Sequence, residues 1–296
     1  MIHYNETTIL TILEWLWDVL AEPILQRLGY VNTPTTDEEW PRVWWCPTDI
    51  LSLLPIHAAG YPNTDTDRGR SVIERVTSAY TSTIKSMKYS RTNLSPLHTG
   101  NIFVAAMPST PNDKPLKSAI SEALGILVKL RQSGKKTGMM VREKGVTVED
   151  VYRQLPEASI AHFICHSVLD ETNPSASKLL FSNGFITVAQ ISQLGLREGA
   201  LAYLSACSTA SIGMGRLEDE AITLSSAFQL AGFSRVVGTL WNAVDRVSHN
   251  VAMTFYEQLR NDPSRAAFAL HRAVLEEREA ARIRPSLWAP FLYTGA

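Results

Sequence analysis

Short apolar segments alternate with helix-like segments through the second half of the chain. The strand-like segments are residues 160–165, 177–181, 201–206 and 235–241. The helix-like segments are residues 188–194, 218–231, 245–259 and 264–281. This alternation is typical of a mainly parallel sheet that helices cover on both faces. We therefore expect an α/β fold whose functional residues gather at the carboxyl ends of the strands.

The first half carries fewer signals of the same kind. Apolar residues recur every three or four positions over residues 6–28, which predicts an amphipathic helix that Pro23 kinks or restarts. Residues 101–108 predict a strand and residues 117–130 an amphipathic helix. Residues 72–80 fit a helix or a strand equally well.

These signals suggest three consecutive parts. We expect a helical segment and linker over residues 1–40, an N-terminal α/β part over residues 41–145 and a second α/β part over residues 146–296. With 45% hydrophobic residues, the 296-residue chain can bury a substantial core.

Charge and hydropathy limit the partners of the protein. The formal net charge is -1, so no strong field favours nucleic acid or an anionic membrane. Charged residues interrupt the apolar N-terminal stretch, and we expect neither a membrane span nor a signal peptide. The natural chain could nevertheless begin before Met1.

The three cysteines, Cys46, Cys165 and Cys207, fit a reducing compartment. Their number is odd and no CxxC spacing occurs, so the sequence predicts neither a disulfide framework nor a structural zinc module. We therefore expect a cytoplasmic protein. We interpret Cys46 and Cys165 as core residues, and we expect no metal because consecutive strand residues such as Cys165 and His166 diverge.

The strand over residues 160–165 ends at His166, and the strand over residues 201–206 ends at Cys207. If these strands are parallel neighbours, both side chains leave the sheet at the same edge. An imidazole beside a thiol can activate it as a nucleophile. The backbone N–H groups of Ser167 and Cys207 could then form an oxyanion hole.

Other polar residues have simpler interpretations. We expect His162, at the start of its strand, to be structural, and His57 to have a packing role. Asp245 follows a strand and either caps the next helix or lines a substrate pocket. Ser205 is a second candidate for substrate binding.

Several longer motifs occur along the chain. Residues 146–296 contain HFICH at 162–166, LSACSTA at 204–210, DEAI at 219–222 and GTLWNAVD at 238–245. Flanking motifs are VWWCPT at 43–48, LPIHAAG at 54–60 and WAPF at 288–291. Together these motifs resemble the CHAT domain family of caspase- and separase-like cysteine peptidases, in its fungal form, and the resemblance implies that residues 146–296 are the catalytic part. It covers most of the chain from about Trp40 onward.

The resemblance implies a caspase-like three-layer α/β/α sandwich with His166 and Cys207 as a catalytic dyad that needs no cofactor. The expected reaction is hydrolysis of a protein or peptide substrate through a Cys207 thioester. A pocket with Asp245 would favour a basic residue before the scissile bond. The family usually has Gly after the His, whereas this chain has Ser167, which restricts φ and could weaken the oxyanion hole.

Two alternatives remain open at the level of sequence. The chain could be a signalling or interaction module that keeps the fold but is silent, or is activated by a regulatory protein or a helical-repeat sensor. It could also be a hydrolase that uses the same thiol on a substrate other than a peptide.

Overall fold

The computed structural model describes most of the chain. The described residues are 5–37, 40–62, 68–92, 101–110, 113–131, 145–168, 170, 173–196, 199–205, 223–261 and 263–295. Within these residues, no helix combines the length and the apolar character needed to cross a membrane.

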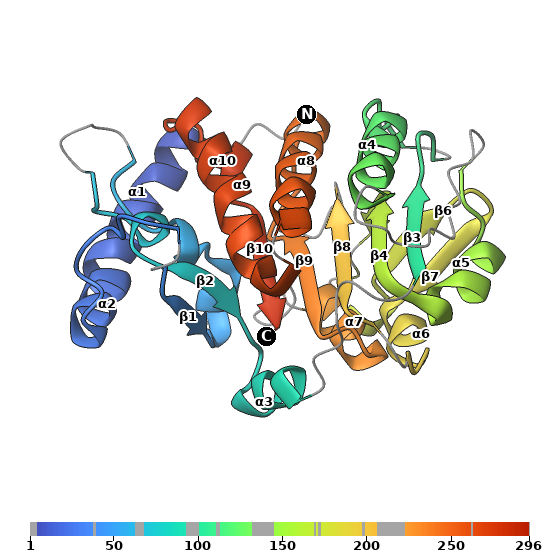
Figure 1. The fold of residues 1–296 in the computed structure, drawn as a ribbon, viewed down its shortest axis with the longest axis horizontal. Helices are drawn as coiled ribbons and strands as arrows, with labels where there is room; N and C mark the ends of the chain where they lie inside the picture. Colours follow the sequence, from blue (N-terminus) through green and yellow to red (C-terminus); the bar gives the residue numbers. More distant parts are fainter. Residues whose placement is uncertain are drawn as a thin grey trace.

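A seven-stranded sheet forms the centre of the molecule (Figure 1). Its spatial order is β1 (Arg42–Trp45), β2 (Thr77–Tyr80), β10 (Phe291–Gly295), β9 (Arg235–Thr239), β8 (Leu201–Ser205), β4 (Ala158–Ile164) and β3 (Asn101–Ala106). All neighbouring strands are parallel except β10 and β9, which are antiparallel. The sheet therefore has two parallel halves that run in opposite directions.

Helices cover both faces of the sheet, as the alternating pattern predicted. One layer contains α4 (Ala119–Arg131), α8 (Asp245–Asn261) and α9 (Ala266–Ala280). The other contains α5 (Val148–Gln154), α6 (Val188–Ser192) and α7 (Thr223–Ala231), with a small sheet of β5 (Ser167–Val168), β6 (Lys178–Phe181) and β7 (Gly184–Thr187). Along β4, Ile160 and Ile164 pack into the first core, whereas Ala161 and Phe163 pack into the second. The three-layer α/β/α prediction is confirmed.

The N-terminal helix divides into three pieces. The predicted amphipathic segment is α1 (Glu6–Leu16), the π-helical turn η1 (Trp17–Ala21) and α2 (Glu22–Leu28). Pro23 lies in the first turn of α2, directly after the π-helical turn, so the α-helix restarts at the proline. Gly29 ends this helix with a φ of 82°, a left-handed conformation that suits glycine.

Several elements were not evident from the sequence. The ambiguous residues 72–80 form the 3-10 turn η5 (Val72–Glu74) followed by β2. Helix α3 (Ile84–Thr92) and strands β5, β7 and β10 are also additions. The remaining short helices are η2 (Asp49–Leu53), η3 (Ile56–Ala58), η6 (Leu155–Glu157), η7 (Pro174–Ala176), η8 (Pro263–Arg265) and α10 (Pro285–Trp288).

The two cysteines in the described part differ from each other. Cys165 is completely buried in the second core, which confirms its predicted role. Cys46 is exposed, so its assignment to the core was wrong. It follows the last residue of β1, and its Sγ lies 3.6 Å from the Ser82 carbonyl oxygen at the end of the sheet.

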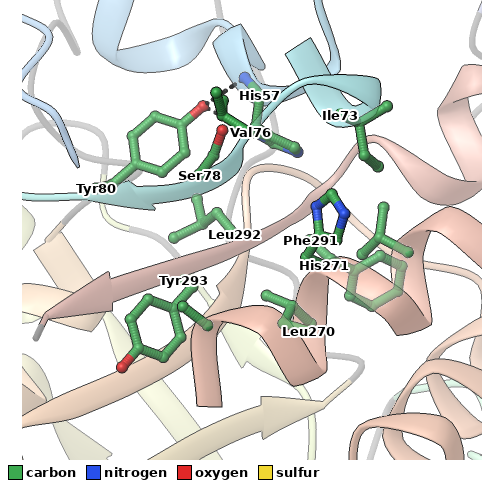
Figure 2. A pocket seen from close by; sticks show the side chains of 12 residues that line it. His57, Ile73, Val76, Ser78, Tyr80, Leu270, His271, Phe291, Leu292 and Tyr293 are labelled. Carbon is green, nitrogen blue, oxygen red and sulfur yellow. Dashed lines mark hydrogen bonds between the residues drawn. The ribbon is translucent and has the colours of Figure 1, made fainter. Parts of the chain in front are cut away.

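Two buried histidines, His57 and His271, line a small cavity between β2, β10 and α9 (Figure 2). Its volume of about 20 Å³ leaves room for about one water molecule. His57 contacts the Tyr80 hydroxyl through Nδ1 at 2.8 Å, which confirms its packing role. Burial, partly offset by the Ala289 carbonyl, lowers the pKa of His57 to about 4. Burial and then the charge of Arg272 lower the pKa of His271 to about 3.

These histidines should make the fold sensitive to acid. Below pH 6.5 the unfolded chain binds protons at both positions while the folded protein does not, so stability falls as pH falls. Each histidine should contribute a loss of about 1.4 kcal/mol per pH unit between roughly pH 6.5 and 5. Urea unfolding across this interval, compared between wild type and His271→Phe, measures the contribution of one site. Identical pH dependence in both proteins would contradict it.

Candidate active site

Strands β4 and β8 are parallel neighbours with a defined register. His162 lies opposite Tyr203, and Ile164 lies opposite Ser205 at the carboxyl end. His166 and Cys207 each follow that last pair by two residues in the sequence. The predicted pairing of the two strands is therefore confirmed, whereas Cys207 itself lies outside the described residues.

His166 is half-buried, and its imidazole contacts the segment before α4. Its Nε2 lies 2.8 Å from the backbone carbonyl oxygen of Lys114. A carbonyl can only accept, so Nε2 carries the proton and, in the neutral ring, Nδ1 is free to accept one. The imidazole is thus held in the tautomer that a general base needs. Lys114 lies between β3 and α4, and sequence reasoning missed it because a backbone carbonyl leaves no trace in residue type.

Ser167 is buried at the start of β5. The Leu180 N–H donates to the His166 carbonyl at 2.9 Å, while Ser167 lies opposite Leu179. Ser167 is therefore in a non-hydrogen-bonded pair, and its N–H is directed away from β6. Among the described non-glycine residues only Asp49 has a positive φ, so Ser167 in place of glycine introduces no left-handed backbone strain.

Polar atoms without partners gather at the carboxyl ends of β8 and β9. Ser205 Oγ, Asn242 Oδ1 and Asp245 Oδ1 are buried and have no hydrogen-bond partner within the described part of the chain. Asp245 is the first residue of α8, yet its Oδ2 accepts from the Ser118 N–H at 2.9 Å. Its carboxylate therefore caps α4 rather than its own helix. Asn242 was not singled out from the sequence, because an asparagine after a strand is unremarkable.

A buried polar network lies beneath this edge of the sheet. His162 Nε2 is 2.8 Å from Glu122 Oε1, and His162 Nδ1 is 3.1 Å from the Tyr256 hydroxyl. Tyr203 stacks on the His162 ring with centroids 4.6 Å apart. Burial, followed by the charge of Glu122, raises the pKa of both tyrosines. The structural role predicted for His162 is confirmed.

The described residues offer no cluster of three or more His, Cys, Asp or Glu side chains that could hold a metal ion. The chemistry at this edge is instead that of an oriented imidazole beside buried hydrogen-bond acceptors.

The sequence matches the CHAT domain family over residues 10–296. The chain belongs to the CHAT domain family. A search among curated proteins found no match. Among solved structures, this CHAT domain resembles a chain of the Saccharomyces cerevisiae separase–securin complex, with a TM-score of 0.55 and 15% identity over 82% of the present chain.

The complex of the Porphyromonas gingivalis RgpB pro- and mature domains is also similar, with a TM-score of 0.58 and 12% identity over 98% of the CHAT chain. The Arg-specific proteinase gingipain R has a TM-score of 0.50 and 11% identity over 75% of it. The CHAT chain spans 14% of the separase-complex chain, 76% of the RgpB chain and 55% of the gingipain R chain. These likenesses establish the caspase-like fold.

Proposed function

We propose that this CHAT domain is a cysteine endopeptidase in which Cys207 is the nucleophile and His166 the general acid and base. The observation that carries the proposal is the register of the parallel strands β4 and β8. Ile164 lies opposite Ser205, so the two strands end at the same level of the sheet, two residues before His166 and Cys207. The Lys114 carbonyl supports it, because it holds His166 in the tautomer with Nδ1 unprotonated.

The proposed reaction proceeds in two halves. His166 Nδ1 takes the Cys207 proton, the sulfur bonds to the peptide carbonyl carbon, and the N–H groups of Ser167 and Cys207 stabilise the oxyanion. His166 returns the proton to the leaving amine as the C–N bond breaks. Water then attacks the thioester, His166 takes its proton, and the acid product leaves as the Cys207 sulfur is reprotonated.

We propose that the substrate carries a basic residue before the scissile bond. Asp245 Oδ1, Asn242 Oδ1 and Ser205 Oγ can all accept hydrogen bonds, and none has a partner within the described residues. Buried polar atoms are rarely left unpaired, so their presence together favours a ligand that donates. An arginine or lysine side chain provides such donors and the charge opposite to Asp245.

We further propose that the protein works in the reducing cytoplasm and that a protein partner regulates it. Neither Cys46 nor Cys165 is part of a disulfide, which suits the cytoplasm. The similar separase and RgpB structures contain securin and a pro-domain, respectively. We propose that a regulatory protein or sensor segment likewise controls the CHAT domain. The alternative is a catalytically silent domain that keeps the fold and acts only as a signalling or interaction module.

A panel of fluorogenic peptides that differ only in the residue before the cleaved bond tests this proposal. We expect cleavage after arginine or lysine, and Asp245→Asn should raise KM for these peptides by roughly tenfold or more, because it removes one charge from a partly buried pair. The control is Arg246→Ala, an exposed change at the adjacent position. Wild-type protein that cleaves no peptide, with or without added partner proteins, would favour the silent module.

A further inference from the structure

We infer that Asp245 is also a positioning residue for His166, acting through the first turn of α4 and the segment that carries the Lys114 carbonyl. This inference rests on the proposed function, since it explains how the general base is held in its working tautomer. It concerns Asp245 Oδ2, whereas substrate recognition was assigned to Oδ1.

The segment between β3 and α4 is fixed at three successive points. The Lys114 carbonyl accepts from His166 Nε2 at 2.8 Å. The Leu116 N–H donates to the Pro108 carbonyl at 3.1 Å, and the Leu116 side chain is buried in the first core. The Ser118 N–H donates to Asp245 Oδ2 at 2.9 Å. A single short segment therefore connects Asp245 to the catalytic imidazole.

The rest of α4 is anchored away from the catalytic end. Glu122, one turn into the helix, contacts His162 on β4 at 2.8 Å. At the far end, Lys129 forms a 2.6 Å ion pair with Glu257 on α8. The Asp245–Ser118 bond is thus the link between α8 and α4 that lies next to the Lys114 segment.

The chemistry of a helix start explains why this link matters. The first N–H groups of a helix lack partners within the helix, and a carboxylate placed there satisfies one of them and interacts favourably with the helix dipole. In α4 that carboxylate comes from a residue 127 positions away in the sequence. When it is removed, the Ser118 N–H loses its partner and the segment can shift, and with it the Lys114 carbonyl.

A shifted carbonyl changes which nitrogen of His166 carries the proton. Neutral imidazole exchanges between two tautomers, and the hydrogen bond to one nitrogen selects between them. With the proton on Nδ1, that nitrogen can no longer accept the proton of Cys207, and the accepting nitrogen is Nε2 on the Lys114 side. Misplacement by about 1 Å can cost roughly a hundredfold in rate, so a loss in kcat of about ten- to a hundredfold is expected.

Nitrogen NMR of the His166 side chain in the substrate-free protein tests the inference. Wild type should show the tautomer protonated at Nε2, and Asp245→Ala should show a mixture with lower kcat. Asp245→Asn keeps an oxygen acceptor for Ser118 and should restore the wild-type nitrogen shifts. Arg246→Ala is the matched control. If Asp245→Ala does not fold, Ser118→Pro replaces it, because it removes the donor N–H and leaves the carboxylate.

Unchanged nitrogen shifts of His166 in a folded Asp245→Ala protein, or equally altered shifts in Arg246→Ala, would overturn the positioning role. The NMR measurement needs no turnover, so its result is separate from that of the peptide panel. If the wild-type protein cleaves no peptide but Asp245→Ala still shows the expected mixture of tautomers, the peptidase proposal fails and the positioning of His166 by Asp245 stands.

Discussion

Replacing His166 with alanine should lower kcat for peptide hydrolysis by about a thousandfold or more, with little change in KM. His166 is the proposed proton acceptor in the attack and the proton donor to the leaving amine, so both halves of the reaction depend on it. The hydrogen bond from Nε2 to the Lys114 carbonyl leaves Nδ1 for this role. Initial-rate kinetics on the best peptide of the panel measure the effect.

The matched control is His271→Phe. His271 is a buried histidine of α9, a helix that packs against β2 and β10, which β9 separates from β8 and β4 in the sheet. Assayed near pH 7.5, where the loss of the low-pKa imidazole has little effect on folding, it should retain activity close to that of wild type. A His166→Ala protein within about tenfold of wild type would show that another group moves the proton.

Replacing His162 with leucine should lower the free energy of unfolding by about 3–5 kcal/mol, the range for breaking a buried polar pair from one side. Glu122 is fully buried; its Oε1 would lose the imidazole, and its Oε2 has no partner within the described residues. The Tyr256 hydroxyl would lose its contact with His162 as well. Equilibrium urea unfolding measures the loss.

The double variant Glu122→Met/His162→Leu separates lost polar pairing from lost packing. Because it removes both members of the pair and keeps similar volume, it should be more stable than His162→Leu alone. A double variant less stable than the single one would mean that the cost comes from packing around the Tyr203 ring instead.

The second half of the fold was predictable because its signals are local. The apolar runs of β4 and β8 end close to His166 and Cys207, and the helices between strands have clear periodicity. A capping box of Thr147 and Asp150 likewise begins α5, and it depends on two residues only three positions apart. These features depend on residues a few positions apart, which a single sequence contains.

The remaining features depend on contacts that residue types do not encode. The antiparallel strand β10 reverses the sheet direction, but the residue types of a five-residue strand give no indication of its orientation. Every residue type has a backbone carbonyl, so the sequence does not reveal the contact of Lys114 with His166. Asp245 caps a helix that begins 126 positions earlier in the sequence, which its residue type does not reveal either. The exposure of Cys46 follows from where β1 ends in space. The division of the chain near residues 40 and 145 stays a prediction.

The central claim is that Cys207 is a nucleophile activated by His166. Labelling by peptide acyloxymethyl ketones, followed by mass spectrometry of the labelled peptide, tests it most directly. Wild type should be labelled at Cys207 by the ketone with a basic residue, His166→Ala should react far more slowly, and Cys207→Ala should not react. Absence of label on wild type, or equal labelling of Cys207→Ala, would contradict the claim.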